Sequence, residues 1–261
     1  RTFLGASGAL GASPLAPLEV AQADTNTGNP ALRGVIVSDA HFGWDNEQQP
    51  APAAQAEAMR RIVTRFPHLD VLVDTGDVHH GNVRGARAAQ ARADWSRIIA
   101  GARHQWPLHY VGGNHDLQSA HDQDSEWRSA QLASLVCRPY YSFTLKGIHF
   151  LALPQLMRAV YVNREALEWA QHDLSVHREL TTIVLSHNNL IGTTGPYEDG
   201  YRGVVNTTAV MALLDAHPQV AAWMHGHNHN YEVVARDGRL YVSNGRIGGF
   251  DPSGREEGGS H

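Results

Sequence analysis

"VAAWMHGHNH", residues 220–229, runs from five apolar residues directly into three histidines that alternate with Gly226 and Asn228. A short apolar run that ends abruptly in polar residues is typical of a buried strand. Imidazole is the commonest metal ligand in proteins and the usual acid–base group near neutral pH. By itself the stretch is compatible with a metal site, a polar surface tract or part of an expression tag, so partners elsewhere in the chain decide its meaning.

The same pattern, an apolar or β-branched run that ends in polar side chains, occurs at four other places. They are GVIVSD (34–39), LDVLVDTGD (69–77), LHYVGGNHD (108–116) and TTIVLSHNN (181–189). Each is read as a buried strand. Helical patterns lie between these strands. They cover residues 53–66, 86–103, 164–175 (with Asn163 as the expected N-cap) and 207–216.

The alternation of strands and helices predicts an α/β fold with largely parallel strands. Residues 142–153 and 231–243 are read instead as hairpins, which turn at Lys146-Gly147 and at Asp237-Gly238. The sheets are therefore expected to be mixed. The chain shows no internal repeat and no interior linker, so we expect a single domain over residues 24–252.

Five strands that all end in His, Asp or Asn indicate one common site, because ligands of open α/β sheets lie beyond the carboxyl ends of the strands. Nitrogen and oxygen donors of this kind suit Zn, Mn, Fe, Ni or Co, and the absence of thiolate argues against a purely structural zinc site. The donors are too many for one ion. With one carboxylate shared, they divide into two sets of four. The candidate residues at the strand ends are Asp39, His41, Asp77, Asn114, His115, Asp116, His187, His227 and His229.

The composition narrows the class of protein. The chain has 261 residues and a formal net charge of −5, which is unlike a basic nucleic-acid binder. It has one cysteine, Cys137, which excludes an internal disulfide and is better explained as a packed residue than as a nucleophile. No run reaches the ~18 apolar residues of a membrane span. The 17 histidines fit the metal-site interpretation.

The two ends of the chain are expected to lie outside the domain. Residues 1–23 have the form of an export signal, with a weakly apolar stretch and an A-x-A site at Ala21-Gln22-Ala23, and Arg1-Thr2-Phe3-Leu4 is similar to half of a twin-arginine motif. Export to the periplasm or cell exterior is the expectation. The alternative is an N-terminal arm of a cytoplasmic protein. Residues 253–261 are read as a tail that includes tag residues.

This ordered set of motifs resembles the calcineurin-like metallophosphoesterase superfamily, whose motifs are D-x-H, G-D, G-N-H-D/E, a single H, and G-H-x-H. All five occur here in that order, from Asp39 to His229. The resemblance implies a four-layer α/β/β/α sandwich of two mixed sheets with a dinuclear metal centre. The compact bacterial members that act as cyclic-nucleotide phosphodiesterases are the most similar type.

Matching positions imply how the residues divide between the two ions. One ion would take Asp39, His41, Asp77 and His229, and the other Asp77, Asn114, His187 and His227, with Asp77 bridging. The ions would be divalent or mixed-valence Mn, Fe, Zn or Ni, and the ligand set does not choose among them.

The implied chemistry is hydrolysis of a phosphoric ester by a hydroxide that bridges the two metals. Two divalent ions, less two carboxylates and one hydroxide, leave one positive charge, which a phosphodiester matches. His115, which is not assigned to a metal, is expected to protonate the leaving group as general acid. Asp116 is expected to orient the His115 ring.

His80 is the third candidate catalytic residue. Purple acid phosphatases carry a ligand tyrosine at this distance after the bridging aspartate, whereas repair nucleases of the superfamily carry a histidine there. His80 is therefore read either as a group that touches the phosphate or leaving group, or as a hydrogen-bonded loop residue. His225 is read as a packed residue that ends its strand, and Trp44, Tyr197, Tyr201 and Arg246 are weaker candidates for substrate contact.

The sequence thus favours a metal-dependent phosphodiesterase that acts on a small phosphate ester. A phosphomonoesterase is the main alternative, because a trivalent iron would remove the charge preference for diesters. A nuclease is the third candidate and depends on His80 alone. A metal-binding scaffold of the same fold is the non-enzymatic alternative. The sequence leaves the substrate and the oligomeric state open.

Overall fold

The computed structural model describes residues 32–42, 52–78, 90–91, 93–95, 97–98, 107–118, 140–153, 161–195 and 203–247. All of them belong to one compact unit, Leu32–His261. The expected export signal, Cys137 and the expected tail lie outside the described residues. So does most of the expected helix at 86–103, of which only residues 90–91, 93–95 and 97–98 are described, all as helix.

The smaller sheet contains three of the expected metal-binding strands. It consists of β1 (Gly34–Val37), β2 (Val71–Asp74) and β3 (Leu108–Tyr110) in the order β1-β2-β3, and both pairings are parallel. All four residues of the central strand β2 are buried, which explains why its sequence, VLVD, is an apolar run and not an alternating pattern. The short helix α3 (Asn114–Gln118) follows β3 directly.

The larger sheet has six strands and is mixed, as expected. The strands are β4 (Tyr141–Leu145), β5 (Ile148–Ala152), β6 (Thr182–Leu185), β7 (Val220–His225), β8 (Tyr231–Arg236) and β9 (Arg239–Asn244). Their order is β4-β5-β6-β7-β9-β8, with antiparallel pairs only at the two hairpins, β4–β5 and β8–β9. Both hairpins turn at the expected dipeptides, Lys146-Gly147 and Asp237-Gly238, where every residue has positive φ, as type I′ turns require.

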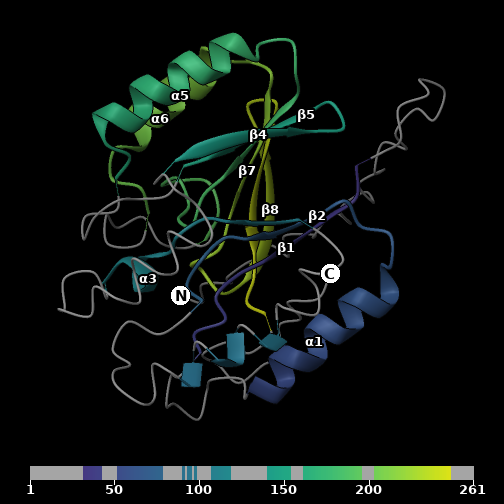
Figure 1. Ribbon diagram of the computed structural model, residues 1–261. Coiled ribbons are helices and arrows are strands. Elements are labelled where there is room, and N and C mark those ends of the chain that lie inside the picture. Colours follow the sequence, from purple (N-terminus) through teal and green to yellow (C-terminus); the bar gives the residue numbers. More distant parts are fainter. Residues whose placement is uncertain are drawn as a thin grey trace, which may run out of the picture. The chain divides into compact units, whose positions relative to one another are not determined.

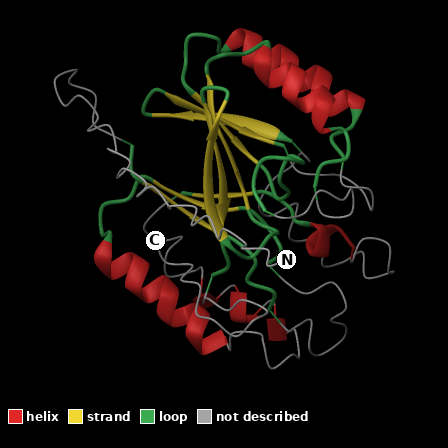
Figure 2. Cartoon of the chain, turned by 180° about the vertical axis from the view of Figure 1, so that it is seen from behind, coloured by secondary structure: helices red, strands yellow, loops and turns green. Residues whose placement is uncertain are grey.

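Helices cover the outer faces of both sheets (Figures 1 and 2). Helix α1 (Pro52–Arg65) packs Ala58, Met59 and Ile62 in the same core cluster as Val37 and Leu72 of the smaller sheet. Helices α5 (Arg164–Val176) and α6 (Thr207–Asp215) cover the larger sheet. Helix α5 begins as expected, because the Asn163 side chain accepts a hydrogen bond from the Ala166 N–H at 2.8 Å.

The two sheets face each other across a third core cluster. Val71 and Val73 of β2 pack there with Phe150 and Ala152 of β5 and with Leu185 of β6. The unit is therefore an α/β/β/α sandwich, which confirms the expected fold, although only the larger sheet is mixed and the described strands of the smaller sheet are all parallel. Parallel strands of both sheets end at the same side, and this places their C-terminal loops together. Among the described residues no helix is long and apolar enough to cross a bilayer.

Candidate metal centre

The loops that follow the parallel strands are joined to one another by backbone hydrogen bonds. After β1, the Asp39 N–H donates to the Gly76 carbonyl at 2.9 Å and the His41 N–H donates to the Asp77 carbonyl at 2.8 Å. After β6 and β7, the Gly226 N–H donates to the His187 carbonyl at 3.0 Å. The expected convergence of strand ends is therefore observed.

The two sheets meet at the site through Asp39 and the 226–229 turn. The His227 N–H donates to Asp39 Oδ2 at 2.9 Å, and Ser38 Oγ donates to the same oxygen at 2.5 Å. Gly226 lies so close that a Cβ atom there would overlap Ser38 Oγ. Only glycine fits this position, because the turn and the end of β1 touch backbone to side chain.

The site residues are held in a backbone conformation that side chains usually avoid. Seven described non-glycine residues have φ between 45° and 66°, and two of them, Lys146 and Asp237, are the hairpin residues. Such conformations cost free energy and cluster at functional sites, where the surrounding structure imposes them. The other five are all expected ligands: Asp39, His41, Asp77, His227 and His229.

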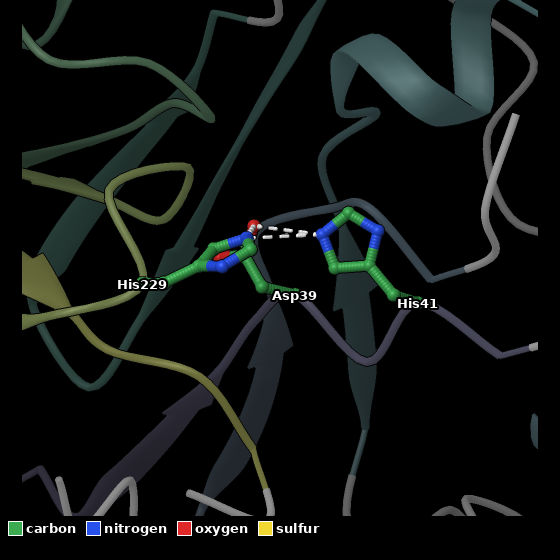
Figure 3. A group of neighbouring side chains, drawn as sticks. All are labelled: Asp39, His41 and His229. Carbon is green, nitrogen blue, oxygen red and sulfur yellow. Dashed lines mark hydrogen bonds and ion pairs between the residues drawn. The ribbon is translucent and has the colours of Figure 1, made fainter. Parts of the chain in front are cut away.

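The first donor group consists of Asp39, His41 and His229 (Figure 3). Asp39 Oδ1 lies 3.4 Å from His229 Nε2 and 3.7 Å from His41 Nε2, and it has no hydrogen-bond partner among the described residues. The two imidazole nitrogens face each other at 3.0 Å. The carboxylate uses its other oxygen, Oδ2, to hold the loops, which leaves Oδ1 for the site.

The second donor group consists of Asp77, His187 and His227, with Asn114 beside it. His187 Nε2 lies 3.2 Å from Asp77 Oδ2 and 3.1 Å from Asn114 Oδ1. The other ring nitrogen, His187 Nδ1, is 2.7 Å from the Thr75 carbonyl and must donate to it, so Nε2 is the nitrogen that faces the site. His227 Nε2 is buried and has no hydrogen-bond partner in the described part of the chain.

Asp77 lies between the two groups. Its Oδ1 accepts a hydrogen bond from the His115 N–H at 2.8 Å. Its Oδ2 is 3.2 Å from His187 Nε2 on one side and 3.7 Å from His41 Nε2 on the other. A single carboxylate oxygen is thus near both donor groups, which is the position of a ligand that could bridge two neighbouring cations.

Burial and the neighbouring charges decide which groups are ionised when no metal is bound. Burial lowers the pKa of His41 to about 4 and that of His227 to about 3, so both rings are neutral near pH 7. Burial alone would raise the pKa of Asp77, but the neighbouring imidazoles, His187 first, lower it below its usual value.

The same carboxylate raises the pKa of His187. Burial is the largest single effect and would lower that pKa, but the charge and hydrogen bond of Asp77, together with the Asp39 charge and the Thr75 carbonyl, outweigh burial and raise it to about 10. In the metal-free protein, His187 is therefore a protonated partner of Asp77. A cation that binds His187 Nε2 must replace that proton.

His115 and Asp116 lie beside the donor groups, on α3. The His115 ring is in edge contact with the His41 ring, with centroids 4.7 Å apart, and its Nε2 is 4.0 Å from Asp77 Oδ2. The Asp116 carboxylate accepts hydrogen bonds from three backbone amides, those of Asp77 at 2.7 Å, Gly113 at 2.9 Å and Val78 at 3.1 Å. Asp116 therefore fixes the loop that carries Asp77. Its expected contact with the His115 ring stays a prediction.

The donor atoms fit two divalent cations. His41 Nε2 and His229 Nε2 face each other at 3.0 Å, and an imidazole nitrogen at each position can donate an electron pair to the same cation. Asp39 Oδ1 and His227 Nε2 are buried atoms without a partner among the described residues, which would be costly unless a ligand binds there. Two carboxylates supply the negative charge that divalent ions need.

His225 ends β7 as a packed residue, as expected, and its ring also makes two polar contacts. It is fully buried, Nε2 is 2.6 Å from Thr194 Oγ1, and Nδ1 is 2.7 Å from the Gly226 carbonyl. Thr194 was missed in the sequence, because no local pattern marks a threonine 31 residues away as its partner.

Arg246 is buried near the end of β1, where the Ile247 N–H donates to the Ser38 carbonyl at 2.9 Å. His80, Trp44, Tyr197 and Tyr201 lie outside the described residues.

A separate cluster of metal-binding residue types lies away from both donor groups and does not have the geometry of a metal site. It consists of His149, Asp173 and His177. The two imidazole rings are stacked, with centroids 4.0 Å apart and an angle of 14° between their planes. Ring lone pairs lie in the ring planes, so nearly parallel rings do not direct them at one point. His149 Nε2 instead lies 2.8 Å from Asp173 Oδ2 and joins β5 to α5.

Comparison with protein families agrees with the arrangement of the site. A family model, the calcineurin-like phosphoesterase superfamily domain, matches residues 32–257. No match is found among curated proteins.

Solved structures show the same fold at low sequence identity. A dimetal phosphatase from Danio rerio is 16% identical, with a TM-score of 0.64 over 84% of this chain and 88% of its own. The purple acid phosphatase PPD1 from yellow lupin (Lupinus luteus) is also 16% identical, with a TM-score of 0.64 over 85% of this chain and 46% of its own. GAP50 of Plasmodium, described as the anchor in the inner membrane complex, is 16% identical, with a TM-score of 0.58 over 87% of this chain and 76% of its own.

Proposed function

The chain belongs to the calcineurin-like phosphoesterase superfamily and is a metal-dependent phosphoesterase, and from that premise we propose that it is a phosphodiesterase with two metal ions. One ion binds Asp39, His41, Asp77 and His229. The other binds Asp77, Asn114, His187 and His227. The observation that carries this assignment is the position of Asp77 Oδ2 between His187 Nε2 and His41 Nε2, at 3.2 and 3.7 Å.

Two divalent ions bound there would supply a Lewis acid for phosphoryl oxygens and a nucleophile from water near neutral pH. The protein's part is to hold these donors in place before substrate arrives. The loop hydrogen bonds of Asp39 Oδ2 and Asp77 Oδ1 leave one oxygen of each carboxylate directed at the site. The Thr75 carbonyl holds the His187 ring so that Nε2 faces inward.

His115 is the proposed general acid. It lies next to the shared carboxylate, and its side chain is 23% exposed, whereas those of His41 and His187 are at most 1% exposed. A partly open imidazole at the edge of the donor groups can reach the leaving oxygen of a bound ester and donate a proton to it. The backbone N–H of His115 donates to Asp77 Oδ1 at 2.8 Å, which fixes its position relative to both donor groups.

The preference for a diester follows from charge. The site brings two carboxylates to two divalent ions, and the proposed nucleophile adds one more negative charge. One positive charge then remains, which a diester monoanion neutralises.

The test compares bis-p-nitrophenyl phosphate with p-nitrophenyl phosphate, using protein stripped of metal and reloaded with Mn²⁺. We expect metal-dependent turnover that favours the diester and falls about 10²–10⁴-fold in His115→Ala. Preference for the monoester would instead establish a phosphatase. Loss of turnover in His115→Ala must occur with both ions still bound, because His115 is not a proposed ligand. Equal turnover in His115→Ala would remove it from the mechanism.

The alternative weighed against hydrolysis is a binding scaffold of the same fold. GAP50 shares the fold and is described as an anchor.

We also propose export through residues 1–23. The test is whether that segment is cut off when the chain is produced in a bacterium with a twin-arginine pathway. Retention of the uncut chain in the cytoplasm would contradict it.

A further inference from the structure

Two loops of the larger sheet carry proposed ligands of the same ion, and a buried threonine connects them. His187 follows β6 and His227 follows β7. Thr194, on the first loop, is fully buried, and its Oγ1 lies 2.6 Å from Nε2 of the fully buried His225 at the end of β7. Neither Thr194 nor His225 belongs to the proposed ligand set.

The direction of the hydrogen bonds follows from the carbonyl at the other end. His225 Nδ1 lies 2.7 Å from the Gly226 carbonyl, which can only accept, so Nδ1 carries the hydrogen. In a neutral imidazole Nε2 then accepts, and the Thr194 hydroxyl donates to it. The Thr194 hydroxyl therefore donates to His225 Nε2, and His225 Nδ1 donates to the Gly226 carbonyl.

The Gly226 peptide group fixes the turn that presents the histidines. Its carbonyl also accepts from the Asn228 N–H at 2.8 Å, and its N–H donates to the His187 carbonyl at 3.0 Å. His227 and His229 have φ of 66° and 60° in this turn. Non-glycine residues hold such conformations only where neighbouring groups impose them, and the His225 ring is one of those groups.

The backbone of Thr194 and Gly195 holds the same turn from the other side. The Thr194 carbonyl accepts from Asn189 Nδ2 at 3.0 Å and more weakly from Asn228 Nδ2 at 3.5 Å. Gly195 lies against the Asn228 side chain, so that a Cβ there would come within 3.2 Å of Asn228 Cγ. The loop after β6 thus contacts the 226–229 turn through side chain and backbone.

We propose that Thr194 is a positioning residue of the metal centre. Its hydroxyl, acting through His225 and the Gly226 carbonyl, sets the turn that carries His227 and His229 and joins it to the loop of His187. The inference rests on the proposed two-metal centre. Removing a group that orients metal ligands typically weakens metal binding by about 10- to 100-fold.

Thr194→Val tests this directly, because valine keeps the shape of threonine and removes only the hydroxyl donor. Thr194→Ser restores the donor. Thr193→Val is the matched control, since the Thr193 hydroxyl lies on the same loop and donates instead to the Leu190 carbonyl at 2.6 Å. Affinity for Co²⁺ is measured by chelator competition, and ligand geometry by the visible absorption spectrum of the Co²⁺-loaded protein.

We expect Thr194→Val to bind at least one of the two ions about 10- to 100-fold more weakly and to alter the Co²⁺ spectrum. Thr194→Ser and Thr193→Val should remain close to the unmodified protein in both measurements. If circular dichroism shows that Thr194→Val does not fold, Thr194→Ala replaces it, because alanine places no methyl group against His225 Nε2.

Unchanged affinity and spectrum in Thr194→Val would overturn the inference while the two-metal centre stands. Equal weakening in Thr193→Val would overturn it too, because the effect would then belong to the loop and not to the donor. An unmodified protein that binds no ions would overturn the proposed function first, and the positioning role with it.

Discussion

Gly226 is a residue at which the two sheets approach each other closely within the site. Its N–H donates to the His187 carbonyl, and any Cβ atom would overlap Ser38 Oγ at the end of β1. Asp39 Oδ2 accepts from Ser38 Oγ at this same point. A side chain at position 226 would therefore separate the donor residues of one sheet from those of the other.

We expect Gly226→Ala to abolish binding of both ions and to destabilise the fold by about 1–3 kcal/mol, because the added methyl group cannot be accommodated without backbone shifts. Gly238→Ala is the control. Gly238 also has positive φ, 75°, but nothing lies within 4 Å of its Cβ position, so alanine should cost roughly 1–2 kcal/mol of strain and leave metal binding intact. Metal content and the thermal unfolding temperature are measured for both variants. Retained metal in Gly226→Ala would refute the close-approach argument.

At the scale of elements, an aromatic stack joins β3 of the smaller sheet to β4 and β5 of the larger one. The His109 ring lies 3.5 Å from the Phe143 ring at an angle of 7°, and Phe143 lies 4.7 Å from Phe150 at 8°. Burial lowers the pKa of His109 to about 4, so the neutral ring is the one that the fold accommodates. The stability that the stack gives to the fold therefore depends on pH.

The direction in which stability changes with pH follows from the number of protons that the folded and unfolded chains bind. Between the ordinary histidine pKa of ~6.5 and the folded value of about 4, the unfolded chain binds more protons, so stability present above pH 6.5 is lost as the pH falls. Because the ring is partly exposed, the loss at pH 5 should be on the order of 1 kcal/mol. His109→Phe keeps the stack and should lose less stability by that amount, because the buried His41 and His227 contribute equally to both proteins. Urea unfolding of both metal-free proteins at pH 7.5 and 5 measures the difference. An equal loss in both would contradict the assignment to His109.

Some elements were predictable because their signals are local. The Lys146-Gly147 and Asp237-Gly238 turns follow from the residues themselves, and Asn163 marks the start of α5. The antiparallel β8–β9 pair follows from the predicted hairpin, but the full strand order was not predictable, since nothing within β9 shows that it pairs with β7 in parallel. The role of Asp116 was also missed, because two of its three amide donors, those of Asp77 and Val78, lie 39 and 38 residues earlier in the chain.

On the scale of the whole molecule, the centre exists only where the two sheets come together. The smaller sheet supplies Asp39, His41, Asp77 and Asn114, and the larger supplies His187, His227 and His229. The candidates were recognisable in the sequence because they lie within a few residues of the end of an apolar run, and the resemblance to the superfamily selected the ligands among them. The left-handed conformations, the shared oxygen of Asp77 and the Thr194–His225 contact depend on the packing of distant segments and required the structure.

The number of Mn²⁺ ions bound per chain, measured by elemental analysis after stripping and reloading, tests the central claim most directly. The proposed centre predicts two ions in the unmodified protein and fewer in Asp77→Asn, which keeps the shape of the shared ligand and removes its charge. A single ion, no ion, or two ions held equally well by Asp77→Asn would contradict a centre built on the Asp77 carboxylate.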